Sequence, residues 1–155
     1  MPLKKCLMLL PSLSALLLVA QSSPILQVTP PEPVNVKAGA AFSSPLTASL
    51  NEGFHMNSSN PTEKYLIPVS LKWTSTTVET EGVEYPKAQT LKLAFEAKPL
   101  SILSGKFTFV TKFKVAQNTP AGPTTVTGKL RYQACNDKAC FPPKTVEIKL
   151  PVNVL

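Results

Sequence analysis

The sequence Val-Thr-Gly-Lys-Leu-Arg-Tyr-Gln-Ala at residues 126–134 decides the fold, because apolar or small residues alternate with polar ones along its length. Successive side chains of a β-strand point to opposite faces, so this alternation predicts a strand with one buried and one solvated face. The same period of two recurs at residues 107–115 and 146–154, and over a shorter stretch at residues 91–95. We therefore expect strands rather than helices to build the molecule.

Turn-forming residues separate the alternating segments. Clusters rich in Gly, Pro, Asn and Ser occur, for example, at residues 58–61 and 118–123. The 16 prolines are about twice the usual share and argue against long uninterrupted helices. About seven or eight strands between such turns predict an all-β fold, an immunoglobulin-like antiparallel β-sandwich, as one domain over residues 24–155.

The N-terminal segment has the composition of a secretory signal peptide. Lys4 and Lys5 precede an apolar stretch at residues 6–20, and small residues follow it. The stretch is shorter than the roughly 20 residues that a membrane-spanning helix needs. We therefore expect residues 1–23 to be cleaved, and the mature domain to be periplasmic or otherwise exported and not to span a membrane.

The formal net charge of +7 does not indicate a nucleic-acid partner. The lysines are spread singly along the polar faces of the predicted strands, and Arg131 is the only arginine, whereas nucleic-acid sites usually gather several basic residues. The sequence also has no phosphate-binding loop and no zinc-spaced cluster of cysteines and histidines. Nucleotide and hydrolytic chemistry are not expected, and neither is a cofactor or a resident metal.

Removal of a signal peptide would leave an even number of cysteines. Cys6 would be lost, and Cys135 and Cys140 would remain with four residues between them. The turn-forming residues 136–139 predict a hairpin that places these two cysteines opposite each other on antiparallel strands, about 4.5–5.5 Å apart at Cα. Cysteines at that separation can form a disulfide.

The spacing alone leaves the role of this disulfide open. A bridge that closes so short a loop stabilises a fold by only about 2 kcal/mol in the chain-entropy treatment, so it can be broken at little cost. That property suits a redox-active pair, but a structural disulfide in a non-catalytic binding or adaptor sandwich has the same spacing. Asp137 and Lys138 act in opposite directions on a thiol pKa and do not decide which sulfur reacts.

The hairpin and a second segment resemble a known family. Leu130–Pro143 reads LRYQACNDKACFPP, and Thr145 completes a Y-Q-x-C…C-x-P-P-x-T pattern. The second segment, NEGFHMN at residues 51–57, runs on to YLIPV at residues 65–69. Over about residues 33–152 the chain thus resembles the N-terminal periplasmic domain of the bacterial thiol:disulfide interchange protein, a membrane protein-disulfide reductase. The resemblance implies an immunoglobulin-like sandwich, which agrees with the period of two.

The resemblance also implies a function. Domains of this family receive electrons from the membrane-embedded and thioredoxin-like parts of their own protein and reduce thioredoxin-fold clients. By position, Cys140 would exchange disulfides with the partner, and Cys135 would resolve the mixed disulfide. This sequence has a shorter cysteine spacing than the best-studied members of the family, and it ends at Leu155 without transmembrane or thioredoxin-like portions. We therefore expect a reductase-like electron shuttle whose membrane electron donor is a separate protein.

Four further residues are candidates for lining the cysteine site. His55, the only histidine, could stabilise a thiolate if its segment lies beside the hairpin, as the resemblance implies. Phe95 is the nearest match by position to an aromatic residue that covers the disulfide in the family, and Tyr132 and Phe141 flank the cysteines. Each of the four also has an ordinary interpretation as a core or surface residue.

A copper carrier is an alternative from another class of function. His55, Met56, Cys135 and Cys140 offer imidazole, thioether and thiolate ligands, which suit copper. The site would need all four to converge with both thiols reduced. We favour this alternative less, because neighbours on a strand, such as His55 and Met56, point in opposite directions.

Overall fold

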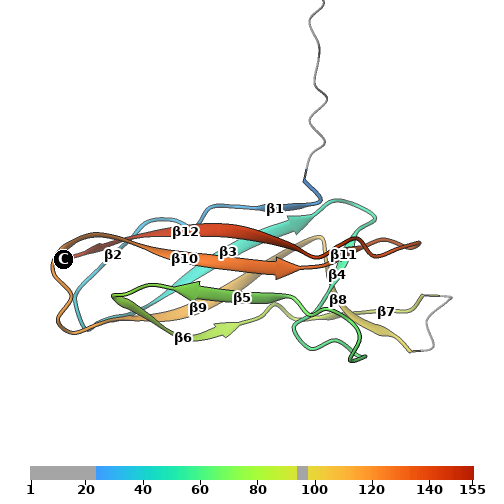
Figure 1. Ribbon diagram of the computed structural model, residues 1–155, viewed down its shortest axis with the longest axis horizontal. Coiled ribbons are helices and arrows are strands. Elements are labelled where there is room, and N and C mark those ends of the chain that lie inside the picture. The colour runs from blue at the N-terminus through green and yellow to red at the C-terminus, as the bar shows by residue number, and fades with distance from the viewer. Residues whose placement is uncertain (1–23, 94–97) are drawn as a thin grey trace, which may run out of the picture.

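The computed structural model describes residues 24–93 and 98–155, and within them it contains twelve strands and no helix (Figure 1). These strands form three four-stranded sheets. The first sheet has the order β1 (Leu26–Val28), β3 (Ala41–Leu50), β9 (Lys106–Val115), β6 (Val78–Glu84). The second has the order β2 (Val34–Val36), β12 (Lys144–Val154), β10 (Gly122–Tyr132), β5 (Ser70–Thr74). The third has the order β11 (Ala134–Cys135), β4 (His55–Asn57), β8 (Leu100–Ser104), β7 (Gln89–Leu91).

The described residues contain more strands than the alternation predicted, because five of the strands have only two or three residues. Segments of that length are too short to show a period of two. The strand expected at residues 91–95 was only partly correct: Leu91 ends β7, residues 92 and 93 lie outside strands, and residues 94–97 lie outside the described residues.

The long strands confirm the alternation on which the fold prediction was based. In β9, every odd-numbered side chain from Phe107 to Val115 is buried, and the intervening ones are more exposed. In β10 the even-numbered residues from Val126 to Tyr132 are buried, and in β12 those from Ile148 to Val154. Each strand therefore turns one face to the core, as half-buried antiparallel strands do.

The buried faces of the first two sheets pack against each other as a sandwich. Phe109 of β9, Leu130 of β10 and Ile148 of β12 belong to one core cluster. Phe113, Val126 and Leu150 belong to a second cluster further along the same strands. The pairings are antiparallel except that between β2 and β12. The fold is an immunoglobulin-like antiparallel β-sandwich, and the prediction of the fold class is confirmed.

Trp73 of β5 packs against both core clusters. Its indole Nε1 donates a hydrogen bond of 2.9 Å to Oγ1 of Thr111, a buried hydroxyl among the apolar residues of β9. Gly128 of β10 lies opposite Trp73, and a Cβ at position 128 would come within 2.7 Å of the indole ring. Glycine therefore interrupts the apolar face of β10 because the indole occupies that space.

The third sheet lies at the end of the molecule opposite the C-terminus (Figure 1). In this sheet β4, which contains His55, pairs with β11, which contains Cys135. The two segments that carry the family resemblance are therefore neighbours in the structure. Within residues 24–93 and 98–155, no helix has the length and apolar character needed to cross a membrane. The signal peptide expected at residues 1–23 lies outside the described residues and stays a prediction.

Candidate functional site

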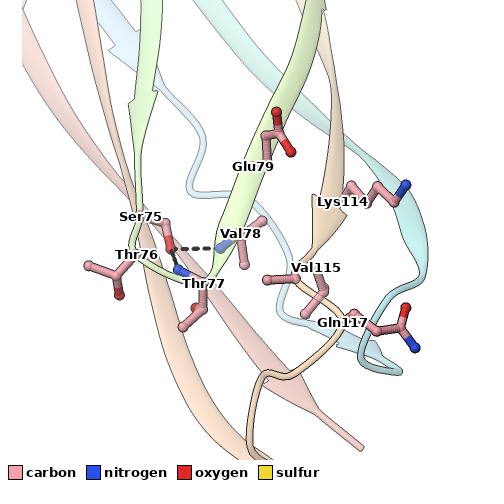
Figure 2. Close-up of a pocket in the computed structure, with 9 residues that line it drawn as sticks. Ser75, Thr76, Thr77, Val78, Glu79, Lys114, Val115 and Gln117 are labelled. Atoms are coloured by element: carbon pink, nitrogen blue, oxygen red, sulfur yellow. Dashed lines mark hydrogen bonds between the residues drawn. The ribbon is translucent and has the colours of Figure 1, made fainter.

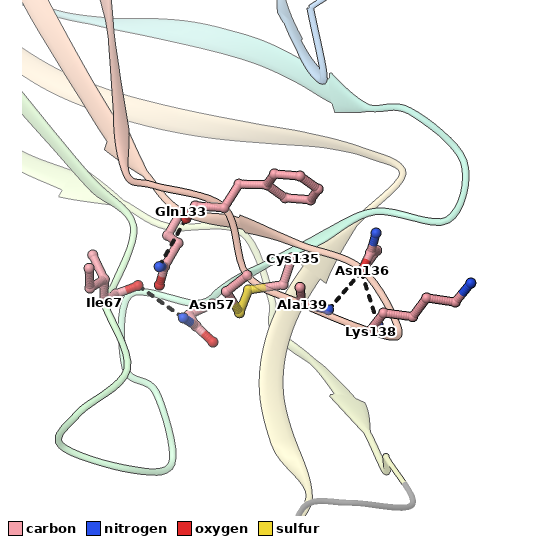
Figure 3. Close-up of a disulfide and its surroundings, with 9 residues drawn as sticks. Asn57, Ile67, Gln133, Cys135, Asn136, Lys138 and Ala139 are labelled. Carbon is pink, nitrogen blue, oxygen red and sulfur yellow. Dashed lines mark hydrogen bonds between the residues drawn. A yellow bond between two sulfur atoms is a disulfide. The ribbon is translucent and has the colours of Figure 1, made fainter.

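The two cysteines lie on opposite arms of a hairpin and are joined by a disulfide (Figure 3). Cys135 ends β11 and forms an antiparallel bridge with Cys140, at a Cα–Cα distance of 4.0 Å. Backbone hydrogen bonds flank this pair on both sides, from Asn136 N to Ala139 O (2.9 Å) and from Phe141 N to Ala134 O (2.8 Å). The cysteines are thus a non-hydrogen-bonded pair, the closer of the two antiparallel pair types. Their separation is accordingly slightly below the one expected from the sequence.

The turn between the cysteines is held by Asn136. Its side-chain Oδ1 accepts hydrogen bonds from the backbone N–H groups of Lys138 and Ala139, each 2.9 Å long (Figure 3). An asparagine that accepts bonds from the residues following it forms a turn by itself. The hairpin therefore has a set of bonds, independent of the disulfide, that can keep its arms together when the sulfurs part.

The two cysteine residues differ in their access to solvent. The side chain of Cys135 is buried, with a relative exposure of 2 %, whereas Cys140 is exposed. Thiol–disulfide exchange needs an open line of approach to the sulfur under attack. Only Cys140 offers a protein partner that approach.

His55 lies beside Cys135 on the neighbouring strand. The two residues are directly opposed in the pairing of β4 with β11, which places their Cβ atoms about 4.5–5.5 Å apart on one face of the sheet. His55 is buried, and burial lowers the pKa of its imidazole below the ordinary value. His55, Cys135 and Cys140 line one small pocket of about 70 Å³, together with Leu66, Leu93 and Leu100.

The remaining candidates lie at different places. Phe141 is 36 % exposed next to Cys140, and its ring packs against Phe54 with centroids 5.9 Å apart. Tyr132 is buried in the core cluster and does not line the pocket beside the disulfide; burial raises the pKa of its phenol. Phe95 lies outside the described residues.

Met56 does not converge with the other three residues of the copper alternative. Its side chain is fully buried in the core cluster, while its neighbour His55 lines the pocket of the disulfide. Within the described parts of the chain, no group of three or more His, Cys, Asp or Glu residues is arranged to hold a metal ion. The alternation of faces along β4 thus separates the thioether from the imidazole.

Sequence reasoning missed the residues that build the wall of the pocket. Asn57 is almost fully buried, and its Nδ2 donates a hydrogen bond of 3.1 Å to Ile67 O, which ties β4 to the following loop (Figure 3). Leu66 and Leu100 come from segments far from the cysteines in sequence. Asn57 and Leu66 lie in the two stretches that carry the resemblance, at residues 51–57 and 65–69, but no pattern in the sequence points to Leu100.

A larger pocket lies at the other end of the sandwich, between the β5–β6 turn and the end of β9 (Figure 2). It has a volume of about 470 Å³ and is lined by residues 75–79 and 114–117. Ser75 Oγ accepts hydrogen bonds from the N–H groups of Thr77 and Val78, so this hydroxyl serves the turn itself. The lining contains no cysteine and no histidine.

Residues 23–151 match the family model described as "Thiol:disulfide interchange protein DsbD, N-terminal". No curated protein sequence matches the chain. Among solved structures, the N-terminal periplasmic domain of ScsB from Proteus mirabilis is similar, with a TM-score of 0.55, 12 % identity and coverage of 81 % of this chain. The chain spans 44 % of the length of that ScsB structure, and at this identity the likeness shows the fold alone.

A second solved structure is the reduced N-terminal domain of DsbD from Neisseria meningitidis. It has a TM-score of 0.46 and 16 % identity, and the alignment covers 75 % of this chain and 82 % of that one.

Proposed function

Because the chain belongs to the family of N-terminal domains of the thiol:disulfide interchange protein DsbD, we propose that it is an exported thiol–disulfide exchange domain that passes electrons between thioredoxin-fold proteins. Cys135 and Cys140 carry the two electrons. The donor is a membrane protein, and the compartment is the periplasm or an equivalent space outside the cytoplasm. Membership of the family supports the proposed partners and the proposed compartment. The different exposure of the two cysteines in the hairpin supports their proposed roles.

The observation that carries the proposal is the unequal exposure of the two bonded cysteine residues. Cys140 is exposed and Cys135 is 2 % exposed, so a partner reaches one sulfur and not the other. In the reduced domain the Cys140 thiolate attacks the client disulfide and forms a mixed disulfide, which releases one client thiolate. Cys135 then attacks Cys140 Sγ, the bond to the client breaks, and the client leaves as a dithiol.

Reduction of the domain by its electron donor uses the same exposed cysteine, Cys140. A donor thiolate attacks Cys140 Sγ, the Cys135–Cys140 bond breaks, and Cys135 takes up a proton. The second donor thiol then attacks the donor sulfur of the mixed disulfide and frees Cys140. The donor is oxidised to a disulfide and the domain is reduced to a dithiol, so two electrons have moved.

The small contribution of the disulfide to folding also supports a redox role. The bridge closes a loop with a sequence separation of 5 residues, for which the chain-entropy treatment gives about 2 kcal/mol. The turn bonds of Asn136 do not depend on the bridge. The sandwich can therefore stay folded through both redox states.

Trapping in the exported fraction tests the roles of the two sulfurs. Cys135→Ala leaves the exposed Cys140 without a resolving partner, so this variant should accumulate mixed disulfides with thioredoxin-fold proteins, visible on non-reducing gels and identified by mass spectrometry. Cys140→Ala is the matched control, since it leaves only the buried sulfur and should trap little. Equal trapping by both variants, or none by either, would contradict the proposed roles.

The reduction potential tests the redox role itself. Equilibration with glutathione or dithiothreitol buffers should give a value above about −300 mV, within the range of exchangeable pairs. A potential well below that value would identify an inert structural bridge and favour a non-catalytic binding sandwich.

A further inference from the structure

His55 lies where two cavities meet. It lines the pocket of about 70 Å³ that contains both cysteines, and also a neighbouring pocket of about 290 Å³ whose lining includes Phe54, Leu91 and Asp137. It is the only histidine of the chain. An imidazole in this position connects the buried sulfur with a space that opens toward the surface.

The imidazole is not engaged elsewhere. Within the part of the chain that the structure describes, no hydrogen bond or ion pair involves the His55 side chain, and no buried side-chain nitrogen is sealed off without a partner. The ring nitrogens are therefore accessible from the pockets. They are free to exchange a proton with a group that lies in the same space.

Burial, and not a neighbouring charge, sets the protonation of His55. Asp137 and Lys138 of the hairpin turn are the charged residues in the linings of its two pockets, and they have opposite signs. β8, which pairs with β4, and β7, which pairs with the far edge of β8, contain only uncharged residues. Burial lowers the imidazole pKa, so the ring is available as a proton acceptor.

Cys135 needs such an acceptor in the resolving step. Its side chain is 2 % exposed, and burial in apolar surroundings disfavours a thiolate. Only the thiolate attacks a disulfide. Without a nearby base, the Cys135 thiol would have to lose its proton to water in a pocket of about 70 Å³.

We propose that His55 takes the proton of the Cys135 thiol as Cys135 attacks Cys140 Sγ in the mixed disulfide, an inference that rests on the proposed exchange function. The new bond joins the two cysteine sulfurs, and the bond between Cys140 and the client breaks. The client sulfur leaves with the electron pair of that bond, and the proton held by His55 passes to it or to water. His55 returns to its neutral form.

Stopped-flow reaction of the reduced protein with dithiobis(nitrobenzoate) separates the two chemical steps. Attack by Cys140 releases one coloured thiolate, and the resolving attack by Cys135 releases the second. In His55→Asn and His55→Gln the second release should slow about tenfold or more at neutral pH, while the first changes less than about twofold. Lys129→Gln is the matched control, since it removes a charge from the exposed face of β10, outside both pockets, and should leave both releases unchanged.

The pH profile gives a readout that a purely structural role would not move. With the base present, the second release should be nearly flat between about pH 7 and pH 9, because His55 already accepts the proton. In the His55 variants it should rise about tenfold per pH unit, as a lone thiol ionises. The profile of the unsubstituted protein tests the proposal even if the variants fold poorly.

The outcomes separate this proposal from the function on which it rests. Loss of the first release in the unsubstituted protein would contradict the exchange function itself. If both releases occur but the second is unaffected in the His55 variants, the role of His55 is overturned and the exchange function stands. The same holds if the second release rises steeply with pH in the unsubstituted protein.

Discussion

The two ends of the sandwich differ in the size of their pockets and in the chemistry of their linings. The pocket at the β5–β6 turn is several times larger, but it is lined by turn residues whose Ser75 hydroxyl is occupied by backbone N–H groups. The pocket at the third sheet is small and contains a disulfide and an imidazole. The difference shows that the reactive groups, and not the volume of a cavity, locate the candidate site.

The same contrast extends to the strands. β9, β10 and β12 have 10 or 11 residues each, and each buries four or five alternate side chains in the core. The strands of the third sheet have between 2 and 5 residues; its His55 lies in β4, its Cys135 ends β11, and Cys140 follows on the other arm of the hairpin. We therefore expect the long strands to determine stability and the third sheet to determine reactivity.

The largest effect should come from the core of the long strands. Phe109 is fully buried and packs edge-on against Tyr85 and Phe107. Phe109→Ala should lower the free energy of unfolding by about 3–5 kcal/mol, measured by urea denaturation. Lys106→Gln, at the exposed start of the same strand, should change it by less than about 0.5 kcal/mol. A small loss at Phe109 would mean that the long strands do not carry the stability.

A smaller loss of stability should accompany complete loss of exchange. The double variant Cys135→Ala/Cys140→Ala should unfold about 2 kcal/mol more easily than the oxidised protein, because only a short loop is released. It should show no electron transfer to a thioredoxin-fold partner. Failure of this variant to fold would mark the disulfide as a structural element and remove the contrast between the two regions.

A variant with a smaller expected loss of stability tests the apolar surface beside Cys140. Phe141→Ala should cost about 1 kcal/mol or less of stability, since the ring is 36 % exposed. Exchange with thioredoxin as a model partner should slow severalfold, while reaction with a small aromatic disulfide should not. Leu155→Ala removes an exposed apolar side chain at the opposite end and should leave both rates unchanged.

The smallest effect should be a dependence of stability on pH in the mildly acidic range. The pKa of His55 is lower in the folded protein than in the unfolded chain, where it is about 6.5. Below that value the unfolded chain binds a proton that the folded protein does not, so stability falls with decreasing pH until the folded-state pKa is passed. Urea denaturation at several pH values should show this loss, and His55→Gln should lack it. An equal loss in the variant would assign it to other groups.

The sandwich could be predicted from the sequence because long antiparallel strands with one solvated face must alternate in polarity. Residues 107–115, 126–132 and 148–154 have the burial that the alternation predicts. The short strands could not be predicted, since two or three residues are too few to establish a period, and β4 buries all three of its residues on both faces. Thr111 and Gly128 interrupt the apolar pattern, and the tertiary contacts of Trp73 explain both.

The sequence by itself determined the class of fold, the hairpin and the joining of the two cysteines, because these depend on contacts between residues close in the chain or on a period within one strand. Only the tertiary structure decided which sulfur is exposed and which residues share its pocket. His55 and Cys135 are 80 positions apart in the numbering, and they meet because β4 and β11 are neighbours in one sheet. Pairing between distant strands depends on how the whole core packs, and a local pattern does not contain that information.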